Sequence, residues 1–225
     1  MGMVCSSGGS VFATAYRLLK ASGYDIQLRV VTDRPCGAEA ICDELAIPWL
    51  RIENQSRIEF SSHAADWLYS KNQVDWTALF FSRLVSNELF SRAPCINFHP
   101  SLLPAFSGFG ALKEALRSKV RFLGATAHRV DDSIDCGPIL AQVISPVLYT
   151  HTLQDIERVS FAHKLYLLLV ISEFAERGEL LDLYEGKSIE GGLKVNSWAN
   201  PSLRDPILAR HYEQFLENEG IRWQY

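Results

Sequence analysis

The sequence predicts an α/β fold: a doubly wound, mostly parallel sheet with flanking helices and a C-terminal helical appendage. The first half of the chain alternates short apolar runs, which are typical of buried strands, with amphipathic stretches of helical period. Glycine-bearing turns such as "SSGGS" connect a short strand directly to a helix. This βαβ rhythm favours parallel strands with helices on both faces of the sheet.

The predicted elements follow one another in chain order. Residues 3–5 form a first strand, and residues 11–23 form a helix that Gly23 closes. The later elements are strands at 26–32, 47–52, 75–81, 95–99, 122–130 and 138–147, and helices at 38–46, 61–72, 111–118, 152–177 and 204–220. We expect residues 1–180 to form the main domain and residues 181–225 to form an extension whose attachment the sequence leaves open.

Composition narrows the classes of function. The chain has 225 residues, 48% of them hydrophobic and 21% charged, which suits one main globular domain. A net charge of −4 argues against a nucleic-acid partner, because phosphate backbones are bound by clustered Lys and Arg. The five cysteines contain no C-x-x-C pair and suit a reducing compartment, so we expect a cytoplasmic protein. No apolar run approaches the length of a membrane span, and no membrane partner is expected.

The strand at 95–99 carries two polar residues near its end. Asn97 and His99 share one face of an extended chain, whereas Phe98 lies on the other. Pro100 keeps His99 extended, so the chain turns only after the histidine. Because ligands in open α/β sheets bind beyond the carboxyl ends of the strands, we expect Asn97 and His99 to face such a crevice. The alternative is a polar strand end that caps a neighbouring loop.

These residue types point to oxyanion and proton chemistry. An amide can donate a hydrogen bond to a developing oxyanion, and an imidazole can donate to it or move a proton. A carboxylate is the usual third partner, and the loop "DDSIDCGP" offers Asp131, Asp132 and Asp135. Residue type alone does not choose among the three, and a solvated hairpin turn is the competing explanation. The six histidines show no metal-ligand spacing, so no metal is expected.

The segments "INFHPSLLPAFSG" and "LGATAHRVDDSIDCGPILAQ" together resemble the folate-dependent formyltransferase superfamily. This superfamily includes glycinamide ribonucleotide formyltransferase, methionyl-tRNA formyltransferase and formyltetrahydrofolate hydrolase. Its signature joins N-x-H-P-S-L-L-P to a later D-x-G-P, and both parts stand here in that order. The resemblance implies the Rossmann-like formyltransferase fold, formyltetrahydrofolate as the formyl donor and a small-molecule amine as the acceptor.

The resemblance also implies the catalytic roles. Asn97, His99 and Asp135 match the superfamily's catalytic Asn, His and Asp. In that superfamily an amine attacks the formyl carbon and a negative oxygen develops. Asn97 and His99 would donate to this oxygen. Asp135 would take the amine proton, directly or through His99 or water.

Two sets of binding residues follow from the same resemblance. Two loops would enclose the pterin of the folate, with the side chains or backbone of Phe81, Ser82, Arg83, Leu84, Val85, His128, Val130, Asp132, Ser133 and Ile134. The glycine-bearing turn and the segment after the strand at 95–99 would hold the acceptor through Gly9, Ser10, Pro100, Ser101 and Gly108.

The acceptor itself is left open. In glycinamide ribonucleotide enzymes the glycine-bearing loop usually ends with Asn and the long helix carries a Glu, whereas Val11 and Ala162 stand at those places here. We expect transfer to a nucleotide or an amino sugar, with hydrolysis to formate and a non-catalytic folate-binding module as alternatives. The net negative charge argues against the methionyl-tRNA formyltransferase branch, because tRNA is a polyanion. The sequence leaves a homodimer open.

Overall fold

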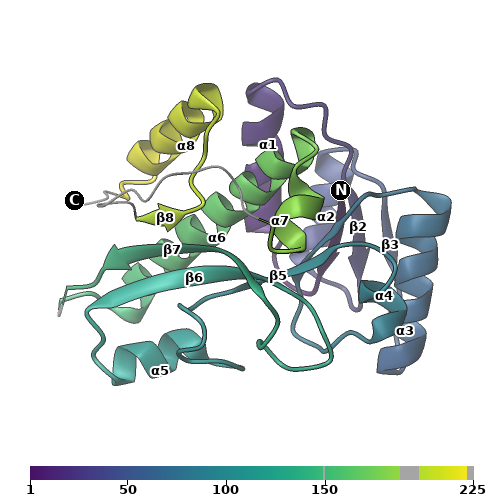
Figure 1. The fold of residues 1–225 in the computed structure, drawn as a ribbon, viewed down its shortest axis with the longest axis horizontal. Helices are drawn as coiled ribbons and strands as arrows, with labels where there is room; N and C mark the ends of the chain where they lie inside the picture. Colours follow the sequence, from purple (N-terminus) through teal and green to yellow (C-terminus); the bar gives the residue numbers. More distant parts are fainter. Residues whose placement is uncertain (149, 188–197, 222–225) are drawn as a thin grey trace.

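The computed structural model describes residues 1–148, 150–187 and 198–221. Within these residues one eight-stranded sheet runs in the order β3-β2-β1-β4-β5-β6-β7-β8 (Figure 1). Strands β1 to β5 are parallel, whereas β6, β7 and β8 each run antiparallel to the preceding strand. The strands are β1 Gly2–Cys5, β2 Arg29–Thr32, β3 Trp49–Arg51, β4 Thr77–Phe80, β5 Cys95–His99, β6 Phe122–Arg129, β7 Ile139–Pro146 and β8 Ala199–Asn200. The predicted doubly wound, mostly parallel sheet is confirmed.

Helices fill most of the connections. They are α1 Ser10–Ala21, α2 Gly37–Glu44, α3 Arg57–Ala65, α4 Asn87–Phe90, α5 Ala111–Arg117, α6 Leu153–Glu176, α7 Leu180–Tyr184 and α8 Pro206–Asn218, with a π-helical segment η1 Asp66–Lys71 that continues α3. The helix predicted at 61–72 begins earlier than expected, because Ser56 caps the Glu59 backbone N–H and the Glu59 side chain accepts from the Ser56 N–H. The strand predicted at 26–32 is shorter and begins at Arg29.

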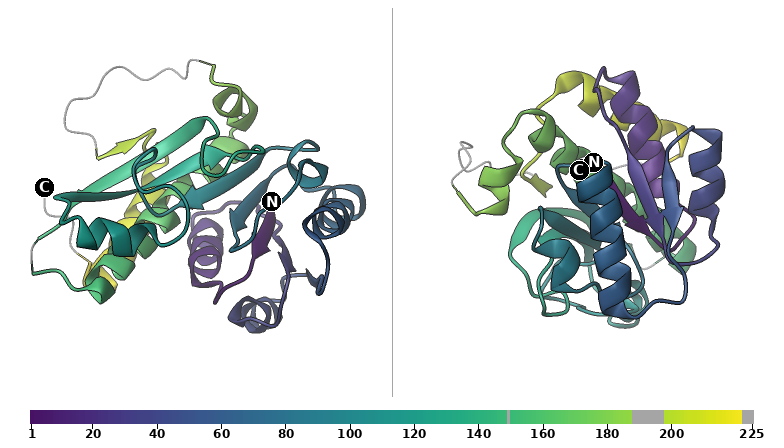
Figure 2. Two further views of the ribbon diagram at one scale, coloured as in Figure 1. Left: turned by 90° about the horizontal axis from the view of Figure 1, so that it is seen from below. Right: turned by 90° about the vertical axis from the view of Figure 1, so that its right-hand side faces the viewer.

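Helices cover both faces of the sheet (Figure 2). On one face, α3 and α4 bury Phe60 and Leu89 against strand residues such as Val4 and Leu79. On the other face, α1, α6 and α8 form the larger core. This division is the one that the βαβ rhythm of the sequence predicts.

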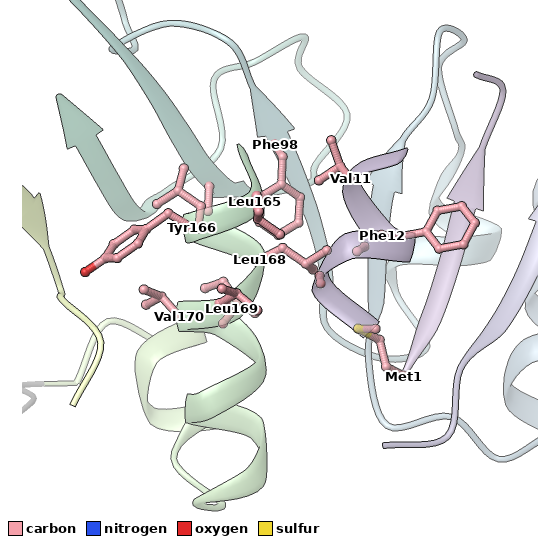
Figure 3. Close-up of a cluster of buried hydrophobic side chains, with 14 of the residues drawn as sticks. Met1, Val11, Phe12, Phe98, Leu165, Tyr166, Leu168, Leu169 and Val170 are labelled. Carbon is pink, nitrogen blue, oxygen red and sulfur yellow. The ribbon is translucent and has the colours of Figure 1, made fainter. Parts of the chain in front are cut away.

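Helix α6 is the central element of the larger core. It is 24 residues long, and nearly every residue from Ala162 to Phe174 is buried, so this helix is covered on all sides. Figure 3 shows Leu165 beside Phe98 of β5, with Val11 of α1 next to them. Val11, which stands where the resemblance implies an Asn, thus packs into the apolar interior.

The C-terminal segment attaches to the same core. Strand β8 pairs with β7, and α8 lies beside α1 on the face that α6 occupies (Figure 1). Asp205 caps α8 by accepting from the Ile207 and Leu208 N–H groups, and its carboxylate also accepts from Tyr24 Oη at 3.0 Å. Tyr212 is buried and donates to the Ala162 carbonyl at 3.0 Å. The helix predicted at 204–220 therefore packs against α1 and α6, which cover one face of the sheet.

Candidate active site

A cavity of about 390 Å³ opens at the carboxyl ends of β1, β4 and β5. The chain proceeds from β1 outward to β3 and returns to β4 on the other side of β1, so the loops after β1 and β4 diverge at this point. Ligands in open α/β sheets bind at such a switch point. The wall is formed by residues 6–7, 79–85, 97–100, 108–110, 128, 130–131, 133–135 and 164. The cavity thus lies where the sequence predicted a crevice, and Asn97 and His99 line it.

Asp135 is the group on which the polar residues of the cavity converge. Its Oδ2 accepts a hydrogen bond from the Gly108 N–H at 2.8 Å and lies 3.2 Å from His99 Nδ1. Its Oδ1 lies 3.3 Å from Asn97 Nδ2 and 3.4 Å from His128 Nε2. The hydrogen bond from His128, followed by that from Gly108, holds the Asp135 pKa below its usual range against the opposing effect of partial burial. Asp135 is therefore an ionised carboxylate at neutral pH.

The two other aspartates of this loop are placed differently. Asp131 lies at the cavity wall, where its Oδ1 accepts a hydrogen bond from the Ser133 N–H at 2.8 Å. Asp132 is exposed and does not line the cavity. Geometry therefore distinguishes Asp135 from its neighbours, which residue type alone did not do.

Each imidazole beside Asp135 is fixed by a backbone carbonyl. His99 Nε2 lies 2.8 Å from the Phe106 carbonyl oxygen, and His128 Nδ1 lies 3.0 Å from the Arg129 carbonyl oxygen. Because a carbonyl oxygen only accepts, the nitrogen that faces it carries a hydrogen in both rings. His99 Nδ1 and His128 Nε2 are the nitrogens that face Asp135. The cluster can hold or pass on a proton beside the carboxylate.

Asn97 completes the polar cluster. Its Nδ2 lies 3.1 Å from His128 Nε2 as well as 3.3 Å from Asp135 Oδ1. An Asn amide has two N–H groups, and Asp135 Oδ1 accepts a hydrogen bond from one of them. A ligand carbonyl in the cavity can accept a hydrogen bond from the same amide. His128, which the resemblance assigns to the pterin pocket, also positions Asn97 and Asp135.

The segment between β5 and α5 is fixed by a buried threonine that no sequence motif singles out. Thr126 Oγ1 donates to the Ser101 carbonyl at 2.7 Å and accepts from the Leu103 N–H at 3.0 Å. Gln142 Nε2 donates to Thr126 Oγ1 and to the Leu103 carbonyl, both at 3.0 Å. Thr126 and Gln142 are positioning residues for the loop that carries Phe106 and Gly108. In the sequence, Thr126 and Gln142 are marked only by their positions within the two predicted strands that pair.

Replacing Thr126 with Val is expected to destabilise the protein by ~1–3 kcal/mol, because the change keeps the side-chain shape but leaves buried backbone groups without partners. Thr14→Val, on the partly buried surface of α1, is the matched control and is expected to cost far less. Urea unfolding of both variants measures the difference. Equal stability of Thr126→Val and the wild-type protein would show that the hydroxyl does not hold this loop.

Gly137 is the glycine of the D-x-G-P signature, and the backbone leaves no room for a side chain there. A Cβ atom at Gly137 would lie 1.9 Å from the Arg129 carbonyl oxygen, inside van der Waals contact. The approach is close because the Arg129 N–H donates to the Pro138 carbonyl at 2.9 Å. The glycine therefore closes the loop that presents Asp135.

Gly137→Ala is expected to destabilise the protein by ~1–3 kcal/mol and to lower turnover, because the backbone must move to admit the methyl group. Gly8→Ala is the control, since a Cβ atom at Gly8 meets open space. Thermal unfolding and turnover are measured for both variants. A Gly137→Ala protein that matches Gly8→Ala in both would contradict the close approach.

The residues predicted to contact the pterin mostly line one side of the cavity. The wall includes Phe81, Ser82, Arg83, Leu84, Val85, His128, Val130, Ser133 and Ile134, whereas Asp132 lies outside it. Arg83 is already engaged: its Nη2 donates to the Gln55 carbonyl at 2.9 Å, and its Nη1 lies 3.4 Å from Asp33 Oδ2. Phe81 stacks on Phe60 with ring centroids 4.9 Å apart. These contacts with Gln55 and Asp33 hold Arg83 in place in the cavity wall.

The residues predicted to bind the acceptor are divided. Pro100 and Gly108 line the cavity, whereas Gly9, Ser10 and Ser101 do not. Ser101 is buried, and its hydroxyl donates to the Ala105 carbonyl at 2.5 Å. The wall residues that were not predicted include Ser6, Ser7 and Lys164.

The described residues were also compared with the requirements of a metal site and of a membrane-spanning helix. No three His, Cys, Asp or Glu side chains among residues 1–148, 150–187 and 198–221 are grouped so as to hold a metal ion. No helix in this part of the chain is long and apolar enough to cross a membrane.

Comparison with known proteins identifies relatives of this site and fold. The Formyl transferase family model matches residues 3–171. Formyltetrahydrofolate deformylase of Escherichia coli (strain K12) is 32% identical over 148 residues, which cover 63% of this chain and 52% of the deformylase. Phosphoribosylglycinamide formyltransferase of Bacillus subtilis (strain 168) is 33% identical over 162 residues, which cover 68% of this chain and 82% of the relative. The chain thus spans about half the length of the deformylase.

Solved structures show the same fold. Glycinamide ribonucleotide transformylase 1 from Symbiobacterium toebii has a TM-score of 0.68 and 27% identity, covering 85% of this chain and 90% of that chain. Phosphoribosylglycinamide formyltransferase from Brucella melitensis has a TM-score of 0.69 and 27% identity, covering 77% of this chain and 94% of that chain. The family match extends from β1 into α6, a span that contains every wall residue of the cavity. The chain therefore belongs to the formyl transferase family.

Proposed function

We propose that this chain transfers a formyl group from formyltetrahydrofolate to the amine of a small molecule. The observation that carries the proposal is the convergence of Asn97, His99 and His128 on the ionised carboxylate of Asp135 in the cavity wall. This cluster offers donors for an oxyanion and a base for a proton. It needs no protein nucleophile for acyl transfer.

The wall after β4 and β6 suits the flat pterin ring of the donor. Leu84, Val85, Val130 and Ile134 present apolar side chains at this part of the cavity. The backbone there can supply the hydrogen bonds that a heteroaromatic ring requires. We therefore place the donor on this side, with its formyl group directed at Asn97.

The proposed reaction uses each polar residue at a stated atom. The acceptor nitrogen forms a bond to the formyl carbon, and Asn97 Nδ2 donates to the oxygen that becomes negative, in place of its present contact with Asp135. Asp135 takes the proton that the amine loses, and His99 Nδ1 relays it. The bond between the formyl carbon and the folate nitrogen then breaks, the nitrogen regains a proton, and the products are tetrahydrofolate and a formamide. One oxyanion donor is typically worth about a hundred- to a thousandfold in rate.

Hydrolysis is the second candidate, and the deformylase relatives favour it. Water would take the place of the amine at the same carboxylate and release formate. The nonpolar Val11 and Ala162, where glycinamide ribonucleotide enzymes carry Asn and Glu, weaken the assignment of that particular nucleotide acceptor. Transfer to another amine remains our proposal.

The experiment that separates the two functions follows a labelled formyl group. Formyltetrahydrofolate carrying ¹⁴C in the formyl group is incubated with the protein, alone and with a panel of primary amines, and the labelled products are separated. We expect an N-formyl product with at least one amine and little formate in its absence. Formate formed at the same rate with and without amines would establish the hydrolase instead.

A further inference from the structure

Phe80 and Phe98 form a stacked pair of aromatic rings in the cavity wall, and the proposed reaction gives this pair no role. Their ring centroids are 5.0 Å apart and their planes differ by 8°. Phe98 is only 4% exposed and lies beside Leu165 and Val11 in the larger core (Figure 3). Phe80, the last residue of β4, is half-buried. Phe98 therefore supports one face of the Phe80 ring, and Phe80 is the accessible member of the pair.

The cavity reaches both faces of the sheet at this edge. Side chains alternate along a strand, so Asn97 and His99 lie on one face of β5 and Phe98 lies on the other. Phe80 packs against the larger core, on the same face as Phe98. Val85 of the proposed donor wall belongs instead to the smaller core, on the face of Asn97. A donor bound there leaves the side of Phe80 for the acceptor.

The loop after β1 borders Phe80, and its two hydroxyl groups already contact protein groups. The Ser6 N–H donates to the Phe80 carbonyl at 3.3 Å. Ser6 Oγ lies 2.9 Å from Ser82 Oγ and accepts from the Ser82 N–H at 3.0 Å, and Ser7 Oγ lies 3.5 Å from Cys5 Sγ. A sugar would bring several hydroxyl groups that need hydrogen-bond partners, whereas an aromatic ring needs mainly contact area. This side of the cavity therefore suits an aromatic ring.

The ring pair stands one residue away from the reacting groups. Leu79 pairs with Asn97 in the parallel ladder, and Phe80 follows Leu79 as Phe98 follows Asn97. Consecutive Cα atoms are about 3.8 Å apart. A ring on Phe80 and an amine beside Asp135 can therefore belong to one small molecule, joined by a short link across the ends of β4 and β5.

We infer that Phe80 is a specificity-determining residue that selects acceptors whose amine is joined to an aromatic ring by a short link. This inference rests on the proposed transfer function and gives the acceptor a chemical class. The acceptor ring stacks on the Phe80 face that Phe98 leaves free, in the ground state and in the transition state alike, so Phe80 acts mainly on KM. An amine without a ring gains nothing from this contact.

The test measures formyl transfer to three amines by the wild-type protein, Phe80→Leu and Phe80→Tyr. Benzylamine carries an aromatic ring, propylamine carries no ring, and glucosamine carries a sugar ring. We expect Phe80→Leu to lower kcat/KM for benzylamine by ~5- to 20-fold, mostly through KM, because leucine keeps the apolar volume but offers no flat face. The values for propylamine and glucosamine should change by less than about threefold. Phe80→Tyr, which keeps the ring, should retain most of the benzylamine activity.

Phe161→Leu is the matched control. Phe161 is half-buried like Phe80 and packs against another aromatic ring, that of Phe215, with centroids 6.1 Å apart. Phe161 does not line the cavity, so its replacement should leave the ratio between benzylamine and propylamine at the wild-type value.

Three outcomes would overturn the inference. The first is an equal loss for benzylamine and propylamine, which would make Phe80 a packing residue only. The second is no loss for benzylamine. The third is a larger loss for glucosamine than for benzylamine, which would assign the Phe80 face to a sugar.

Failure of the transfer function is recognised separately. If the wild-type protein formylates no amine, calorimetric binding of benzylamine and propylamine to the protein saturated with a hydrolysis-resistant formyl-folate analogue decides. Tighter binding of benzylamine that Phe80→Leu abolishes supports the ring site. Equal binding of the two amines, or no binding of benzylamine, refutes it.

Discussion

Replacing Asp135 with Asn is expected to slow the chemical step by about a hundredfold or more, because the change removes the base and the negative charge while keeping the shape of the side chain. Asp135 contacts His99, Asn97, His128 and the Gly108 N–H, so no other carboxylate can take its place. Single-turnover formyl transfer measures this step, or formate release if no amine is accepted. Asp131→Asn and Asp132→Asn are the controls and should cost much less, since Asp131 serves the turn and Asp132 is exposed.

The Asp135 carboxylate also contributes to stability, with a definite pH dependence. Its pKa is depressed in the folded state, so its contribution is present above the ordinary aspartate pKa and is lost as the pH falls through the folded value. The difference in unfolding free energy between wild type and Asp135→Asn should therefore be largest near neutral pH and shrink in acid. An Asp132→Asn variant as slow as Asp135→Asn would show that the role of the base has been assigned to the wrong aspartate.

Replacing His99 with Asn or Ala is expected to lower turnover by about a hundredfold or more and to leave folate affinity within a few fold. Both ring nitrogens of His99 contact protein groups, namely the Phe106 carbonyl and Asp135, so the ring acts on the proton held by the carboxylate. Equilibrium binding of folate and single-turnover rates are measured in parallel. His63→Asn, at an exposed position of α3, is the matched control. Near-normal turnover of the His99 variants would refute the catalytic assignment.

Much of the fold follows from patterns that are local in the sequence. Alternating apolar runs and amphipathic stretches place the parallel strands because each element buries a continuous face. The attachment of α8 was not predictable, because Tyr212 and Asp205 are held by Ala162 and Tyr24, which lie far away in the chain. The early start of α3 was missed although its signal, Ser56 followed by Glu59, is present in the sequence.

The candidate site was predictable to a similar extent. Strand alternation placed Asn97 and His99 on one face, and the D-x-G-P signature selected Asp135. The contact of His128 with both Asn97 and Asp135 depends on the register between β5 and β6, which no local pattern specifies. Lys164 was not predicted as a wall residue, because it stands in a largely buried and apolar stretch of α6.

The central claim is that the formyl group of a folate lies among Asn97, His99 and Asp135, and a crystal structure with a hydrolysis-resistant formyl-folate analogue tests it most directly. The proposal predicts that the formyl oxygen lies about 3 Å from Asn97 Nδ2, within hydrogen-bond distance. It also predicts that the pterin contacts Leu84, Val85 and Val130. An analogue bound with its formyl group away from Asn97 and Asp135, or a saturating analogue that leaves the cavity empty, would contradict the account.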